Sequence, residues 1–248
     1  MLRLLHITFA AEEPRRLAGF WAEVLDGHSA EHAGESWRAH SDGPELFFNR
    51  MEKSPTIELP IHLDVNVPDR EAELQRILGL GGKLVETKSH AIGELSETWT
   101  VMRDPEGNGF CIQSPPNTTQ RSIGNVTFSC AEPIRLGKFW AAALGWPAEP
   151  IDQGFIQTLL DAGMDERETE SFYVTRETPT SRPRLLFQRR EKSRPASYPI
   201  HLDFRSDNRE ADVERLTGLG ATMQQTKTDP DRTWTVMRDP ESNPFCIE

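Results

Sequence analysis

The sequence predicts an α+β protein built from two tandem copies of one unit. Pro60-Ile61-His62-Leu63-Asp64 recurs as Pro199-Ile200-His201-Leu202-Asp203, and the nine residues from Thr98 recur unchanged from Thr233. Each copy alternates strand-like segments with amphipathic helical ones. A chain of 248 residues can form two domains that each bury a core.

The copies are expected to be two domains, at residues 1–116 and 121–248. Residues 114–120 are rich in proline and polar side chains, which is typical of a linker. The spacing between matched residues grows between Trp146 and Arg184, so copy two carries an insertion. Its apolar spacing behind Asp152 predicts an inserted helix near 151–163.

Each copy opens with a short alternating strand, around His6 to Phe9 in copy one. A helix follows whose apolar side chains share one face and belong to the core: Leu17, Phe20, Trp21, Val24 and Leu25 in copy one, and Leu136, Phe139, Trp140, Ala143 and Leu144 in copy two.

A second strand and helix follow in copy one, the strand over 61–67 and the helix from about Asp69 until Gly79, Gly81 and Gly82 close it. Each copy therefore holds two strand–helix–strands modules. Further strands are predicted near 36–40, 46–50, 83–87, 98–103 and 109–113, with a turn at 104–108.

Composition excludes several classes of partner. The formal net charge of -11 and the pI near 5.2 argue against nucleic acid, because phosphate contacts need clustered Lys and Arg. The first residues are too short and too polar for a signal peptide, and no long apolar run follows. We therefore expect a cytoplasmic protein that does not bind membranes, and a homodimer is a possible assembly.

In this arrangement the sequence resembles the vicinal oxygen chelate (VOC) superfamily, in its glyoxalase-like or bleomycin-resistance-like branch. The resemblance covers nearly all of both copies. It rests on the opening strand with its Phe-Trp helix, on His62-Leu63-Asp64, and on Asp104-Pro105-Glu106-Gly107-Asn108 before a short final strand. It implies paired βαβββ modules whose curved mixed sheets form a cup around a small ligand or metal. It implies no single reaction, and it leaves open whether modules pair within one chain or between chains.

Strand alternation assigns the side chains that point into each cup. In copy one these are His6 and Thr8, Phe47 and Asn49, His62, Asp64 and Asn66, and Cys111 and Gln113. In copy two they are Asn125 and Thr127, Leu186 and Gln188, His201, Asp203 and Arg205, and Cys246 and Glu248.

Metal-dependent relatives use His, Gln or Glu at four of these places. Here the four hold His6, Phe47, His62 and Cys111 in copy one, and Asn125, Leu186, His201 and Cys246 in copy two. A catalytic divalent site needs at least three N, O or S ligands, and Phe47 and Leu186 supply none. We therefore expect no metal and no other cofactor. If a divalent metal binds, it binds in copy one only, through His6, His62 and Cys111.

The histidine and aspartate two residues apart on one strand are the candidate catalytic pair, His62 with Asp64. Such a pair can tune imidazole for acid–base work near neutral pH, or can simply satisfy buried polar groups. Candidate ligand-binding residues are His6, Trp99, Cys111, His201, Asp203 and Trp234.

Purely structural roles remain open for the other repeated or titratable residues. Cys111 and Cys246 can be small buried packing residues. Trp99 and Trp234 can be core residues, with Arg103 and Arg238 beside a turn. His28, His32, His40 and His90 lie in polar sequence and are expected to be solvated.

Two functions compete. The first is a protein that binds a small organic molecule in a sheet-lined cup, without a metal. The alternative is a lyase or isomerase of glyoxalase type that acts in the copy-one cup through His6, His62 and Asp64, with or without a metal. A third possibility is that copy two is only a structural partner.

Overall fold

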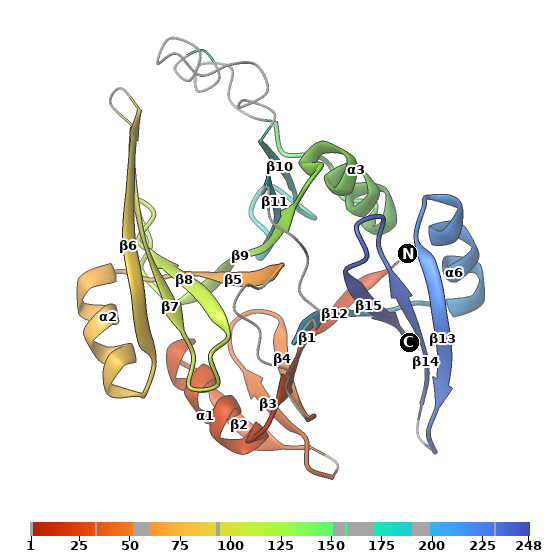
Figure 1. The fold of residues 1–248 in the computed structure, drawn as a ribbon, viewed down its shortest axis with the longest axis horizontal. Coiled ribbons are helices and arrows are strands. Elements are labelled where there is room, and N and C mark those ends of the chain that lie inside the picture. Colours follow the sequence, from red (N-terminus) through yellow and green to blue (C-terminus); the bar gives the residue numbers. More distant parts are fainter. Residues whose placement is uncertain are drawn as a thin grey trace.

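The chain folds into two curved mixed sheets with helices on their outer sides (Figure 1). The computed structural model describes residues 2–32, 34–51, 60–92, 95–150, 157, 171–189, 199–230 and 232–248, with the backbone alone at 90–92, 95 and 96. The helix expected near 151–163 lies outside the described residues, apart from Gln157. The predicted α+β class is confirmed.

Copy one contributes two modules, each of a strand, a helix and further strands. The first is β1 (Arg3–Ala11), α1 (Pro14–Val24), β2 (His28–Glu31), β3 (Trp37–His40) and β4 (Glu45–Arg50). The second is β5 (Ile61–Asn66), α2 (Arg70–Gly79), β6 (Lys83–Ile92), β7 (Leu95–Arg103) and β8 (Gly109–Gln113).

Copy two repeats this order. Its first module is β9 (Ser122–Cys130), α3 (Pro133–Leu144), β10 (Phe172–Thr175) and β11 (Arg184–Arg189). Its second is β12 (Ile200–Arg205), α6 (Arg209–Gly218), β13 (Thr222–Thr228), β14 (Thr233–Arg238) and β15 (Pro244–Ile247).

Each sheet joins one module from each copy. The eight-stranded sheet has the order β13-β14-β15-β12-β1-β4-β3-β2, and the seven-stranded sheet has the order β10-β11-β9-β5-β8-β7-β6. The joints are antiparallel pairs of opening strands, β1 with β12 and β5 with β9. The first module therefore shares a sheet with the last, and the two middle modules share the other.

The two modules of one copy meet instead through their apolar faces. In copy one the Trp21 ring from α1 lies 5.5 Å from Phe9 of β1 and 5.0 Å from Phe110 of β8. In copy two Trp140 makes the matching contacts with Phe128 and Phe245, at 5.7 and 5.1 Å. These aromatic rings are buried together within a hydrophobic core whose residues come from both copies.

The repeated Asp-Pro-Glu turn ties the two modules of a copy together. Asp104 accepts a hydrogen bond from the Trp21 indole, and Glu106 accepts the amides of Glu12 and Glu13 at the start of α1. In copy two Asp239 and Glu241 do the same for Trp140 and α3. Both helices begin with proline and lack a side-chain cap of their own, so these glutamates replace it.

Most predicted elements form where the periodicity placed them. The helix α2 begins where expected, with Asp69 as its N-cap, and the chain leaves it through Gly81 at φ +95°. The strand β2 was not predicted, because its four residues alternate too briefly to stand out. Among the described residues no helix is both long and apolar enough to span a membrane.

Candidate functional site

A cavity of about 270 Å³ opens on the inner face of the eight-stranded sheet. We call this region the first cup. Its walls come from β1 and β4 of copy one and from β12 to β15 of copy two. The residues assigned inward by strand alternation line it: His6, Thr8, Phe47, Asn49, His201, Asp203, Cys246 and Glu248.

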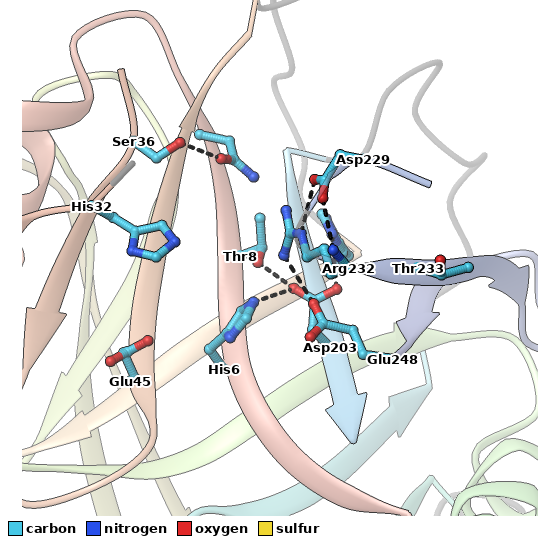
Figure 2. A network of polar contacts seen from close by, with 12 residues as sticks. His6, Thr8, His32, Ser36, Glu45, Asp203, Asp229, Arg232, Thr233 and Glu248 are labelled. Atoms are coloured by element: carbon cyan, nitrogen blue, oxygen red, sulfur yellow. Dashed lines mark hydrogen bonds and ion pairs between the residues drawn. The ribbon is translucent and has the colours of Figure 1, made fainter. Parts of the chain in front are cut away.

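Asp203 is the polar centre of the first cup. It is 5% exposed, and side chains from both copies form hydrogen bonds or ion pairs with it. On the same oxygen, Oδ2, it receives the Thr8 hydroxyl and lies 3.0 Å from His6 Nε2, as Figure 2 shows. Its Oδ1 lies 3.4 Å from His201 Nε2. Two imidazoles and a hydroxyl therefore converge on one buried carboxylate.

The charges of this cluster are coupled. Burial alone would raise the pKa of Asp203, but His201 and His6 outweigh it and hold that pKa well below its usual range. Burial lowers the pKa of His201 less than the Asp203 carboxylate raises it. Burial and Asp203 together raise the pKa of the Cys246 thiol far above its ordinary value. Cys246 is thus a neutral thiol rather than a nucleophile.

A β-bulge positions His6. Leu4 of β1 faces Phe204 and His6 faces Asp203, so Leu5 is the extra residue. The second sheet repeats the irregularity at Gly124, just before Asn125, and a Cβ at Gly124 would lie 2.5 Å from the side chain of Asn66. The bulge therefore aims the equivalent first-strand residue at the aspartate in both sheets.

The matching face of the seven-stranded sheet is the second cup, centred on Asp64. Asp64 accepts Asn125 Nδ2 at 2.9 Å and the Thr127 hydroxyl at 2.7 Å, and its Oδ1 lies 3.4 Å from His62 Nε2. Asn125 thus occupies the place of His6, and Arg184 Nε donates to its Oδ1 at 2.9 Å. Burial raises the pKa of Asp64, but His62 and the two neutral donors lower it further.

The predicted metal set is not a single site. His6 lies in the first cup, whereas His62 and Cys111 lie in the second, because opening strands of different copies pair. The proposed enzyme site of His6, His62 and Asp64 is divided in the same way. Strand alternation predicted the side chains that line the first cup, except Arg205, which is exposed and does not line it. The grouping of these residues by copy is wrong, because the opening strands pair between copies.

The first cup nevertheless contains donors that suit a divalent transition metal. The ligand atoms of His201, Asp203 and Cys246 lie within 4.8 Å of one another, and His6 contacts the same carboxylate. In kind, two imidazoles and a carboxylate match Zn²⁺ or Fe²⁺. In the second cup the corresponding set is His62, Asp64 and Cys111, with Asn125 in place of the second imidazole.

The structure also tests the purely structural roles expected for the repeated cysteines, tryptophans and arginines. Cys111 and Cys246 are buried free thiols, as expected for packing residues. Trp99 and Trp234 are only partly buried, so the core interpretation is wrong for both, and Trp234 lines the cavity. Arg103 and Arg238 donate to carbonyls of their own turns, as expected.

The prediction that the unmatched histidines are solvated is wrong for His40, whereas His28 and His32 are exposed as expected. His40 is half-buried in β3, 3.0 Å from Glu45 and stacked on His28 of β2. His32 packs edge-on against Phe47 with ring centroids 5.3 Å apart. The His90 side chain lies outside the described residues. The missing signal for His40 was β2, because the strand near 36–40 was predicted without the neighbouring strand whose His28 stacks on its ring.

Sequence reasoning also missed two cations of the cavity wall, Lys227 and Arg232. The signal was available, since Arg232 precedes Trp234 by two residues and so shares its strand face. Lys227 lies opposite Trp234 in the antiparallel register of β13 and β14.

This fold and these paired cups define a two-domain protein of the vicinal oxygen chelate class. The family model of the Glyoxalase-like domain matches residues 6–113 and again residues 125–248. The chain therefore belongs to the Glyoxalase-like domain family.

Solved structures agree on the fold. Glyoxalase I from Zea mays is similar with a TM-score of 0.67 and 12% identity, over 100% of this chain and 92% of that one. A glyoxalase I mutant from Zea mays has a TM-score of 0.68 and 14% identity, over 100% of this chain and 92% of that one. At such identities the likeness establishes the fold alone. A comparison with curated proteins gives no match.

His201 is expected to titrate above its ordinary pKa of 6.5 in metal-free protein, because the Asp203 carboxylate stabilises the imidazolium. The pKa of His201 is higher in the folded than in the unfolded protein. The contribution of His201 to the free energy of unfolding is therefore present below pH 6.5 and lost as the pH rises through its folded-state pKa. Asp203→Asn should bring the pKa below 6.5, and Asp64→Asn should leave it unchanged. Imidazole NMR titration measures this. A wild-type value at or below 6.5 contradicts it.

Proposed function

We propose that the protein binds a small organic molecule in the first cup, without a metal. The observation that carries this proposal is a cavity of about 270 Å³ whose polar centre, Asp203, already has its donors in place. Around this centre much of the wall is apolar, from Phe47, Met51, Trp234, Val236 and Pro244. A mostly apolar pocket with a few convergent polar groups is the usual form of a small-molecule site.

The saturation of Asp203 supports a metal-free site. Its oxygens interact with Thr8, His6 and His201, so this buried charge is compensated without an ion. Phe47 supplies no ligand at the closing strand, and its ring packs 5.0 Å from the His6 ring. If a metal bound here, His6, His201 and Asp203 would hold it, and it would polarise an oxygen of the ligand.

A second candidate function is a lyase or isomerase of glyoxalase type. The observation that favours it is the position of His6 and His201 on either side of one carboxylate at the cavity wall. One imidazole can accept a proton from a bound molecule while the other returns one, with Asp203 stabilising whichever is charged. In the second cup only His62 is available beside Asp64, so this chemistry belongs to the first cup.

Binding is tested with 4-fluorobenzamide and 4-fluorobenzoate, since Trp234 and Phe47 offer flat apolar walls. We expect Trp234→Ala to weaken probe binding about tenfold through lost contact area and stacking. The matched variant Trp99→Ala in the second cup should leave that affinity unchanged. Dissociation constants follow from ¹⁹F relaxation of the probes. Equal affinities in wild type and Trp234→Ala would remove the first cup as the binding site.

Metal independence is tested separately. We expect protein treated with a chelator to keep its melting temperature and its probe affinity, and added Zn²⁺, Ni²⁺ or Fe²⁺ to shift neither, because no ion contributes to the folded state. Elemental analysis of the purified protein checks occupancy. A stoichiometric metal that His201→Gln removes and His62→Gln retains would establish a metal centre instead.

A further inference from the structure

The hairpin of β13 and β14 brings two cations to the mouth of the first cup. Lys227 and Arg232 line the cavity together with Trp234, which lies opposite Lys227 in the strand register. The Arg232 guanidinium lies over the Trp234 ring, 4.7 Å from its centroid. Neither residue contributes to the Asp203 cluster, so they form a separate part of the cavity wall.

Arg232 is held in place by two carboxylates. Its Nη1 donates to Glu248 Oε1 at 2.9 Å, and its Nε donates to Asp229 Oδ2 at 3.4 Å, as Figure 2 shows. These bonds and the stacking fix the plane of the guanidinium while using two of its three nitrogens. Within the described part of the chain, Nη2 of Arg232 and the ammonium of Lys227 have no hydrogen-bond partner. Both remain available to a ligand.

The equivalent hairpin of the second cup, β6 with β7, carries different charges on the same framework. The strand register matches Lys227 with Lys88, Gln225 with Glu86, and Arg232 with Glu97. Lys88 pairs with Glu86 at 2.9 Å, so its charge is compensated. Glu97 thus precedes Trp99 by two residues, as Arg232 precedes Trp234. The two cups therefore carry opposite charges next to equivalent tryptophans.

We propose that Lys227 and Arg232 form an anion subsite that selects an organic carboxylate with a flat apolar body, and that the second cup lacks this subsite. The proposal rests on ligand binding in the first cup. The ligand's ring packs on the Trp234 and Phe47 side of the cavity, and its carboxylate binds Arg232 Nη2 and Lys227 Nζ. Charge-assisted bonds of this kind are the stronger ones in proteins.

The acidic groups of the cavity do not oppose this assignment. Asp203 is compensated by the hydroxyl and imidazoles around it, and Glu248 is compensated by Arg232. Asp229 is likewise paired with Arg232, so the cationic donors without a partner among the described residues, Arg232 Nη2 and Lys227 Nζ, are what the mouth offers a ligand. The ligand's carboxylate then lies at the mouth and its body extends toward His6 and His201.

The experiment compares 4-fluorobenzoate with its neutral analogue 4-fluorobenzamide and with 4-fluorobenzylammonium, by ¹⁹F relaxation on the full chain. We expect wild-type protein to prefer the carboxylate over the amide by about tenfold. Arg232→Glu, which copies the second cup, should abolish that preference while amide binding persists. Arg232→Lys should retain part of it, and Glu97→Gln should change nothing. Persistent amide binding shows that each variant is folded.

The outcomes separate this proposal from the proposed function. Equal binding of carboxylate and amide, a preference that survives Arg232→Glu, or tightest binding of the ammonium would overturn the anion subsite while ligand binding in the cup stands. If no probe binds, or if Trp234→Ala affects none of them, both proposals fail together.

Discussion

The antiparallel pairing of opening strands from different copies determines the rest of this structure. β1 pairs with β12 and β5 pairs with β9, and these two joints convert four modules into two sheets. The pairing leaves the apolar faces of each copy free to pack on Trp21 or Trp140. It also places His6 opposite Asp203, although they come from different copies. Both cups therefore require both copies.

Duplication kept the framework and changed the chemistry. Each cup keeps an aspartate, a threonine, a cysteine and a histidine in equivalent places, and each has a bulge before the first-strand residue. That residue is His6 in one cup and Asn125, held by Arg184, in the other. One cup can therefore share a proton between two imidazoles around Asp203, whereas the other surrounds Asp64 mainly with neutral donors. The proposed difference at Arg232 and Glu97 follows the same division of roles.

Local patterns predicted the modules and the inward faces because both depend on short-range periodicity and on caps such as Asp69. They did not predict which modules share a sheet. His62 is equally well placed to meet His6 or Asn125 when only its own strand is considered, since a repeated sequence gives repeated strands with the same edges. Partner choice depends on long-range packing around Trp21 and Trp140. The position of Arg232 two residues before Trp234 was a usable signal, but its contact with Glu248 comes from the fold alone.

The most direct test of this account is a disulfide across the joint between the copies. Arg3 of β1 lies opposite Arg205 of β12, both are exposed, and paired strands bring opposed residues within bonding reach. Arg3→Cys with Arg205→Cys should form an intramolecular bond, detected by mass spectrometry of the monomer. Arg3→Cys with Asn66→Cys, the equivalent pair within copy one, should form none. A bond in the second variant and not in the first would show that each cup is built from one copy, and would contradict the account.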